Sequence, residues 1–258
     1  MGEEKINERL PLIKDVAIKL GGVNPVKEFI PIRPAAHYSM GGIKVNIRAE
    51  TPIAGLYAAG ECSCISVHGA NRLGTNSTAE CLVFGRVAGE EAAKHATKST
   101  IHEIPKQKLS AEEKRVYNEI LGSEGNERVA VIRDEMRRIM NERVWIYRKG
   151  DELQTALKEI RELQRRFKHI KVEDKGKPFN TGFLSALQLG FMLDLAEVTI
   201  VGAVARTESR GAHSRIDHPR RDDQNWLKHT LAYYTKEGPR LEYTPVTITR
   251  WPPAARTY

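Results

Sequence analysis

The chain has 258 residues, 40% hydrophobic and 29% charged, enough to bury the core of one large domain or two ordinary ones. It has no uninterrupted run of eighteen apolar residues and its first residues are charged, which predicts neither a membrane span nor a secretory signal. The net charge is +8, but basic residues alternate with acidic ones along helical stretches. That pattern indicates solvated helix faces and argues against nucleic-acid binding.

The cysteines of the chain are Cys62, Cys64 and Cys81. They are too few for a disulfide framework in a chain of this length, and their spacing is not that of a zinc site. We therefore expect reduced, partly buried thiols, no bound metal and a cytoplasmic location.

Residues 8–20 predict a short helix that ends at the pair Gly21-Gly22. From residue 28 to residue 59 the pattern changes to short apolar runs separated by turns. Within GGIKVNI the apolar residues alternate with polar ones, which predicts a half-buried strand whose inner face carries Ile43, Val45 and Ile47.

A helix rich in small residues follows, from Ser77 to about residue 95. Ser77 and Glu80 have the spacing of a capping box, in which the two side chains satisfy backbone amides at a helix start. Such an end attracts anions, although plain capping is the simpler interpretation. The preceding segment, residues 69–74, combines small residues with Arg72, whose planar guanidinium suits a carboxylate or a phosphate.

Beyond a polar connector at residues 97–109, three helical stripes predict an antiparallel bundle. The residues of these stripes, which we expect in the core, are Val129, Ile132, Met136 and Ile139; Leu153, Leu157, Ile160 and Phe167; and Leu184, Leu187, Phe191, Leu195 and Val198. After Ala205 the chain is polar, Arg-rich and loop-like. The predicted fold class is α+β, with short strands and a small-residue helix in residues 1–100 and a three-helix bundle with an irregular tail in residues 101–258.

Several segments in a fixed order resemble the flavoprotein subunit of succinate dehydrogenase and fumarate reductase. They are HYSMGG (37–42), GLYAAGE (55–61), SVHGANRLGTNS (66–77), RTESRGAHSRIDHPRRDDQNWLKHTL (206–231) and PPAARTY (252–258). The resemblance runs from about Asn7 to Tyr258. It implies an FAD-dependent oxidoreductase of electron transport and the tricarboxylic acid cycle, with residues 1–100 forming the last capping-domain helix and the carboxyl-terminal part of the FAD-binding domain.

The resemblance also implies roles for individual residues. His37 and Arg72 match residues that bind the dicarboxylate substrate, succinate or fumarate. Glu61 matches a residue that hydrogen-bonds FAD, while Ser77 and Thr78 match a pair whose backbone meets the flavin; the family has leucine where this chain has Thr78. The expected lining of the same pocket is Gly42, His68 and Asn71. For Arg206, Arg210, His213 and Arg215 we expect an inter-domain or subunit contact rather than a catalytic role.

The sequence has no GxGxxG motif near its amino terminus. In the resembling family the pyrophosphate-binding turn and the proton-delivering arginine precede the matched region. We therefore expect the carboxyl-terminal portion of a longer flavoprotein, inactive alone, whose partners are an iron–sulfur subunit and, through it, a membrane anchor, with a peripheral cytoplasmic location. Alternative interpretations are an L-aspartate oxidase-like flavoprotein and a non-catalytic interaction module derived from the family.

Overall fold

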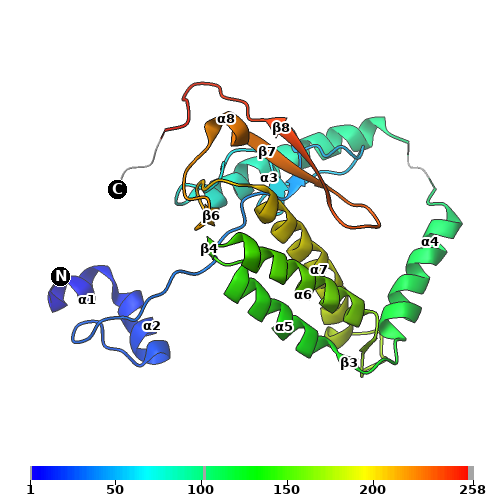
Figure 1. Cartoon of the computed structure of the whole chain (residues 1–258), viewed down its shortest axis with the longest axis horizontal. Coiled ribbons are helices and arrows are strands. Elements are labelled where there is room, and N and C mark those ends of the chain that lie inside the picture. The colour runs from blue at the N-terminus through cyan, green and yellow to red at the C-terminus, as the bar shows by residue number, and fades with distance from the viewer. Residues whose placement is uncertain (1, 101–102, 255–258) are drawn as a thin grey trace. The chain divides into compact units, whose positions relative to one another are not determined.

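The computed structural model describes residues 2–100 and 103–254 (Figure 1). These residues form two compact units that divide between His37 and Tyr38. The fold is a mixture of helices and short strands, as the sequence predicted at the level of fold class. The predicted domain boundary near residue 100 stays a prediction.

The first unit contains two helices, α1 (Glu3–Arg9) and α2 (Pro11–Gly21). They replace the single helix predicted over residues 8–20, because Pro11 has no amide hydrogen to donate and starts a new helix. Gly22 ends α2 in the left-handed conformation, with φ +65°, so the predicted stop is confirmed. None of the described residues of this unit is buried.

The second unit begins with two short parallel strands, β1 (Ile43–Lys44) and β2 (Ser63–Cys64), which precede the long helix α3 (Asn76–Lys98). The strand predicted through Ile47 ends early, because the Asn46 side chain accepts hydrogen bonds from the amides of Arg48 and Glu50 and turns the chain. Of the three residues predicted to face inward, only Val45 is buried.

The cysteines are free, as predicted. Cys64 is half-buried, whereas Cys62 and Cys81 are exposed, so the expected partial burial holds for one thiol of the three.

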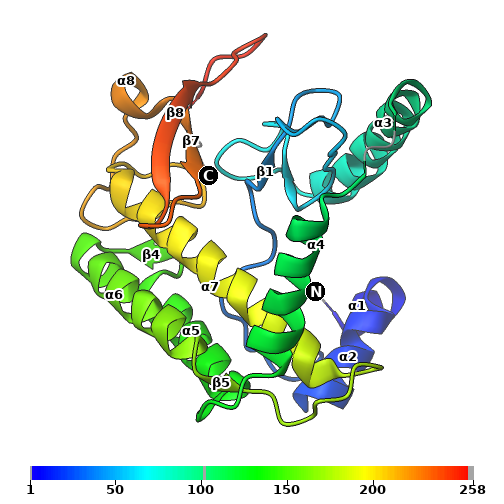
Figure 2. The ribbon, with the colours of Figure 1, turned by 90° about the vertical axis from the view of Figure 1, so that its right-hand side faces the viewer.

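Helices dominate the following segment. They are α4 (Lys106–Glu113), a π-helical turn η1 (Lys114–Leu121), α5 (Val129–Arg143), α6 (Gly150–Phe167) and α7 (Thr181–Ala205). Short parallel pairs link their ends: β3 (Glu127–Arg128) with β5 (Ile170–Lys171), and β4 (Tyr147–Arg148) with β6 (Ser214–Arg215). Helix α6 packs against both α5 and α7, and Figure 2 shows the three side by side.

One hydrophobic cluster fills the space between these helices. Its fully buried aliphatic side chains include Ile132, Leu153, Ile160, Leu189 and Ile200. The inward face of α7 differs from the predicted one: Leu184, Phe191 and Leu195 of the expected stripe are exposed, and the buried positions are Ala186, Leu189, Leu193, Ala196, Glu197, Ile200 and Ala203. Because α7 is apolar on nearly all sides, its periodicity does not identify the buried face.

By length and composition α7 could cross a membrane, contrary to the sequence prediction, which considered only uninterrupted apolar runs. Among the helices of the described residues it is the one that meets this criterion. The core helix of a globular domain meets it equally well, and α7 packs against α5 and α6.

The region after α7, predicted to be loop-like, contains a short helix α8 (Asp223–Trp226) and a hairpin. Strands β7 (Lys228–Tyr233) and β8 (Arg240–Pro245) pair antiparallel, with Lys228 opposite Pro245 and Tyr233 opposite Arg240. The prediction missed them because the polar residues around them resemble a loop. The last four residues of the PPAARTY motif lie outside the described residues.

Buried charged side chains hold residues 206–226, which we call the arginine-rich segment, in place. Glu208 is fully buried and accepts hydrogen bonds from Arg206 and Arg210 and from the amide of Asp222. Burial by itself would raise the pKa of Glu208, but these hydrogen bonds keep the pKa below its ordinary value. The buried Arg215 donates to the carbonyls of Ala203, Val204 and Arg206 at the end of α7, where a helix leaves acceptors unsatisfied.

Both ring nitrogens of His213 have hydrogen-bond partners, one on a side chain and one on the backbone. Arg148 donates to Nδ1 of His213 at 2.8 Å, and Nε2 lies 3.1 Å from the carbonyl oxygen of Arg206. Burial lowers the pKa of His213 from its ordinary 6.5 to about 4, and the neighbouring arginines add to the effect. The ring is therefore neutral in the folded protein at pH 7.

The α7 face can be tested with two leucines. We expect Leu189→Ala to lower the free energy of unfolding by about 2–4 kcal/mol, because it removes fully buried methyl groups and leaves a cavity. The matched control Leu195→Ala, at a position 64% exposed, should change it by less than about 0.5 kcal/mol. Urea unfolding measures both. Equal losses would mean that Leu195 is as buried as Leu189 and would contradict the assigned inward face of α7.

His213 predicts a pH dependence of stability. Its folded-state pKa is below its unfolded value, so its contribution is complete above pH 6.5 and is lost as the pH falls towards 4. Allowing for the partial exposure of the ring, we expect a loss of about 1 kcal/mol between pH 7 and pH 5. Urea unfolding of His213→Gln should lack this part of the slope, and His218→Gln is the control. A slope unchanged in His213→Gln would contradict the assignment.

Candidate functional site

The candidate site lies where the segment after His37 meets the start of α3. It is built from Tyr38 and Ser39, from residues 66–75, which we call the Arg72 loop, and from the first turns of α3. Five of the eight residues expected at the flavin and the dicarboxylate lie on these segments: His68, Asn71, Arg72, Ser77 and Thr78.

A buried carboxylate connects the segments. The side chain of Glu80 is 2% exposed, and its Oε2 lies 2.6 Å from Oη of Tyr38 and 2.6 Å from Nε2 of His68. Burial and the hydrogen bond to Glu80 raise the pKa of Tyr38, so the hydroxyl keeps its proton and donates it. An ionised carboxylate only accepts, so Nε2 of His68 is also a donor.

This arrangement overturns the predicted capping box. Helix α3 begins at Asn76, its N-cap residue is Thr75 in the left-handed conformation, and no described side chain caps it. Glu80 turns inward to Tyr38 and His68 instead of back to the helix start. The start of α3 therefore has no side-chain cap. The amides of Asn76, Thr78 and Ala79 donate to the carbonyls of Leu73 and Thr75, and the Ser77 amide has no acceptor among the described residues.

Arg72 lies on the ring of Tyr38. The guanidinium carbon is 4.9 Å from the ring centroid, a cation–π distance, and Nη1 donates to the carbonyl of Leu73 at 3.2 Å. Nε of Arg72 is buried without a hydrogen-bond partner, and so is Nδ1 of His68. Buried polar atoms are normally paired, so these two mark a place where a polar ligand would complete the site.

Glu61 and Ser39 form a second contact nearby. The Ser39 amide donates to Oε1 of Glu61 at 2.9 Å, and the Glu61 side chain is exposed. Ser77 and Thr78 lie in the first turn of α3, where Ser77 is half-buried and Thr78 exposed. Asn71 is exposed on the Arg72 loop.

Gly42 has a backbone reason for its identity. Its φ is +139°, and a side-chain carbon there would lie 2.4 Å from the carbonyl oxygen of Cys62. The glycine therefore allows β1 and β2 to approach, so its presence is not a sign of a ligand.

The other dicarboxylate candidate, His37, is an exposed residue that ends the first unit. The structure describes that unit by itself, so the pairing of His37 with Arg72 stays a prediction.

The arginine-rich segment packs against the backbone of the Arg72 loop. The Ala212 amide donates to the carbonyl of Ala70 at 2.9 Å, and a side-chain carbon at Gly211 would lie 2.5 Å from the backbone of Ala70. Ser66 and His229 are hydrogen-bonded at 2.9 Å. Residues far apart in the sequence thus fix the start and the middle of the loop.

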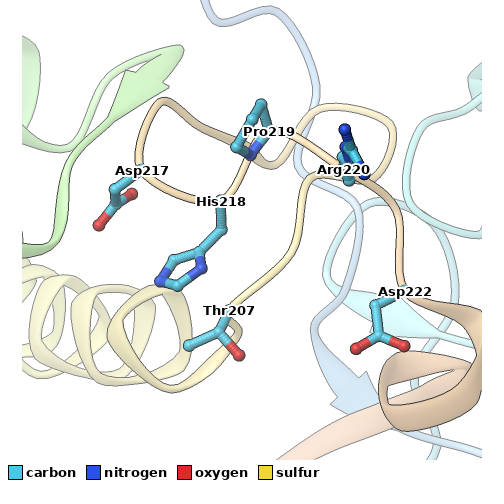
Figure 3. A pocket seen from close by; sticks show the side chains of 6 residues that line it. All are labelled: Thr207, Asp217, His218, Pro219, Arg220 and Asp222. Carbon is cyan, nitrogen blue, oxygen red and sulfur yellow. The ribbon is translucent and has the colours of Figure 1, made fainter.

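A surface pocket of about 320 Å³ occurs in the same segment (Figure 3). It is lined by Thr207, Asp217, His218, Pro219, Arg220 and Asp222. Its acidic groups already have partners: Asp217 accepts from Arg215, and Asp222 caps α8 by accepting from Asn225. The carboxylates that line the pocket are therefore paired within the fold, and we assign the pocket no function. The described residues include no group of three or more potential ligands placed to hold a metal ion.

Sequence reasoning assigned no role to Tyr38 and interpreted Glu80 as a helix cap. Tyr38 is 42 residues from Glu80, and a contact at that separation leaves no local pattern. One signal was available: Glu80 is an acidic residue in the first two turns of α3, where its neighbours Ser77, Thr78, Ala79 and Cys81 are small.

Family models match most of the chain. The model described as fumarate reductase flavoprotein C-term matches residues 133–258, and the model described as FAD binding domain matches residues 1–78. The second model ends at the first turn of α3, where the candidate site lies.

Curated relatives match over the whole chain. The fumarate reductase flavoprotein subunits of Haemophilus influenzae and Escherichia coli are 48% and 47% identical to it over 262 residues, which is 43% and 44% of their own lengths. A solved Escherichia coli quinol fumarate reductase superposes with a TM-score of 0.94 at 47% identity, covering 99% of this chain and 44% of that one. A Mycobacterium smegmatis Sdh1 structure gives 0.83 at 33% identity, covering 96% and 42%.

The chain thus spans less than half the length of these relatives. Its similarity to them covers the Arg72 loop, the start of α3 and the arginine-rich segment together. The chain belongs to the succinate dehydrogenase and fumarate reductase flavoprotein family of FAD-dependent oxidoreductases.

Proposed function

We propose that the chain is the carboxyl-terminal portion of a flavoprotein that interconverts succinate and fumarate through FAD. In this proposal the chain supplies residues at the flavin edge and the dicarboxylate site. Electrons pass to an iron–sulfur partner, which a membrane anchor holds, so the flavoprotein is peripheral to the cytoplasmic face of the membrane. The names and overall similarity of the relatives support this proposal.

The observation that carries the proposal is the buried, unpartnered Nε of Arg72. A guanidinium binds a carboxylate with two parallel hydrogen bonds, and in the side-on arrangement Nε donates one of them. Charge-assisted bonds of this kind contribute roughly 1.5–3 kcal/mol each. His37 is the proposed second contact to the dicarboxylate, while His68, Asn71 and Gly42 are the proposed lining.

FAD fits the uncapped end of α3. No side chain caps the first turn, the Ser77 amide has no acceptor among the described residues, and the helix start carries the partial positive charge that favours an electron-rich ring. We assign that contact to Ser77 and Thr78; because it uses backbone amides, threonine in place of the family leucine is tolerated. Glu61 would accept hydrogen bonds from hydroxyls of the cofactor. The group supplies the two-electron redox chemistry when bound.

The remaining architecture is proposed to serve as a scaffold. Helices α5, α6 and α7 would act as the three-helix bundle of a domain from about residue 101 onward, with the segment after α7 as its tail. In the preceding part of the second unit, several large apolar side chains are exposed: Ile43, Ile47, Ile53 and Leu56. Exposed apolar patches mark surfaces that another segment or partner covers, which supports a larger FAD-binding domain.

Arginine substitution tests the dicarboxylate site. In the complete flavoprotein, we expect Arg72→Ala to lower kcat/KM for succinate by about 100-fold or more, because a carboxylate in a dry site loses its partner. His37→Ala should have a smaller effect in the same direction. Flavin content should stay near that of the unsubstituted protein. Dye-coupled succinate oxidation and flavin absorbance measure the two quantities.

Arg86→Ala is the matched control, since Arg86 is an exposed residue of α3 paired with Glu90. Near-normal kinetics in Arg72→Ala would place the substrate carboxylate elsewhere. Turnover of L-aspartate in preference to succinate would favour an aspartate oxidase instead, and the absence of bound flavin would favour a non-catalytic module.

The 258-residue chain by itself should bind FAD weakly or not at all and should not oxidise succinate. It offers the cofactor Glu61 and one helix end, and each 1.4 kcal/mol of missing contacts lowers affinity tenfold. Flavin fluorescence and dye reduction after addition of FAD check this. Stoichiometric tight binding with succinate-dependent turnover would contradict it.

A further inference from the structure

We propose that Glu80 is the positioning residue of the Arg72 site: its buried carboxylate fixes Tyr38 and His68, and through the Tyr38 ring it sets the place of the Arg72 guanidinium. The inference rests on the proposed function, because it assumes that Arg72 binds the substrate carboxylate. Glu80 itself would touch neither substrate nor flavin.

The first step is the burial of the charge. A carboxylate removed from water is costly unless hydrogen bonds replace its hydration. Glu80 is 4% exposed, and a single oxygen, Oε2, accepts from both Tyr38 and His68 at 2.6 Å. These short distances are typical of charge-assisted bonds. The two donors come from segments that no other described side-chain hydrogen bond joins to each other.

The second step is the orientation of His68. With Nε2 donating to Glu80, the imidazole has one allowed direction for its other nitrogen, Nδ1, which is buried and without a protein partner. The His68 side chain is 10% exposed. Arg72, four residues further along the same loop, likewise has a buried nitrogen, Nε, without a protein partner.

The third step links the position of the Tyr38 ring to that of the Arg72 guanidinium. The Tyr38 and His68 rings meet edge to face, with centroids 5.6 Å apart, and the Arg72 guanidinium lies over the Tyr38 ring. The ring of Tyr38 is therefore held by the hydrogen bond from its hydroxyl to Glu80, by the perpendicular ring of His68, and by Arg72 over its face. If the hydroxyl is released, the platform under the guanidinium is released with it.

The charge of Glu80 is separable from its shape. Gln has nearly the same volume but is neutral: its amide oxygen accepts hydrogen bonds without the charge that strengthens them, and its amide nitrogen is a competing donor. Asp keeps the charge on a shorter side chain. We therefore expect Glu80→Gln to disturb the site more than Glu80→Asp, the opposite of the order expected if only packing mattered. Glu90→Gln, at an exposed position of the same helix, is the matched control.

The first measurement is the ring nitrogen NMR spectrum of His68 in the 258-residue chain, assigned with His68→Gln. We expect Nε2 protonated in the unsubstituted chain, in Glu90→Gln and in Glu80→Asp, and a mixture of tautomers in Glu80→Gln. This signal does not depend on flavin or turnover. An unchanged His68 spectrum in Glu80→Gln would overturn the proposal.

The second measurement is a double-mutant cycle in the complete flavoprotein. We expect Glu80→Gln to raise KM for succinate by about tenfold with flavin content retained, and Glu80→Asp to restore most of the loss. In an Arg72→Lys background the same substitution should add less than about threefold, because Lys does not make the planar stack on Tyr38. Equal effects in both backgrounds would show that Glu80 acts independently of Arg72 and would overturn the proposal.

The two failures are distinguishable. If the unsubstituted flavoprotein does not turn over succinate, the proposed function fails, and the His68 spectrum still decides whether Glu80 positions the ring. If turnover is normal and only the cycle is additive, the proposed function stands and the role of Glu80 is wrong.

Discussion

The candidate site depends on the satisfaction of one buried negative charge. Taking a carboxylate out of water costs several kcal/mol unless donors replace the lost hydration. The donors to Glu80 are Tyr38, at the start of the second unit, and His68, on the Arg72 loop. Folding can therefore bury the Glu80 carboxylate only when both segments are in place. The electrostatic requirement of one residue fixes the relative places of three pieces of chain.

The same device recurs on the other side of the Arg72 loop. Glu208 is buried and fully partnered by Arg206, Arg210 and a backbone amide, while Arg215 covers the carbonyl end of α7. These hydrogen bonds commit Arg206, Glu208, Arg210 and Arg215 to contacts with their own segment and with the end of α7. A segment so committed is rigid, and rigidity suits a support for a loop whose own side chains have unfilled positions.

The sequence predicted the fold class, the free cysteines and the stop at Gly22, because each depends on local composition or on a single residue type. It failed where the answer lies in contacts distant along the chain. The apolar faces of α7 are alike, so only the packing of α5 and α6 selects Leu189 over Leu195. Glu80 matched a capping box because the local spacing was right, and only Tyr38 and His68, brought in by folding, draw it inward. The order of motifs singled out Arg72, which the structure places over the Tyr38 ring, and the start of α3; the binding roles of both stay predictions.

The contact between Gly211 and Ala70 couples the size of two residues from distant parts of the chain. Gly211 has φ +58°, and there is no room between it and the Ala70 backbone for even one carbon atom. Substitutions in the Arg72 loop and in the turn at residue 211 therefore have to be compatible with each other. A loop transplanted into a relative, or diversified in the laboratory, retains its shape only when the matching turn travels with it. A chimaera that takes the two segments from different proteins is expected to keep the shape of the loop only when both proteins have these two small residues.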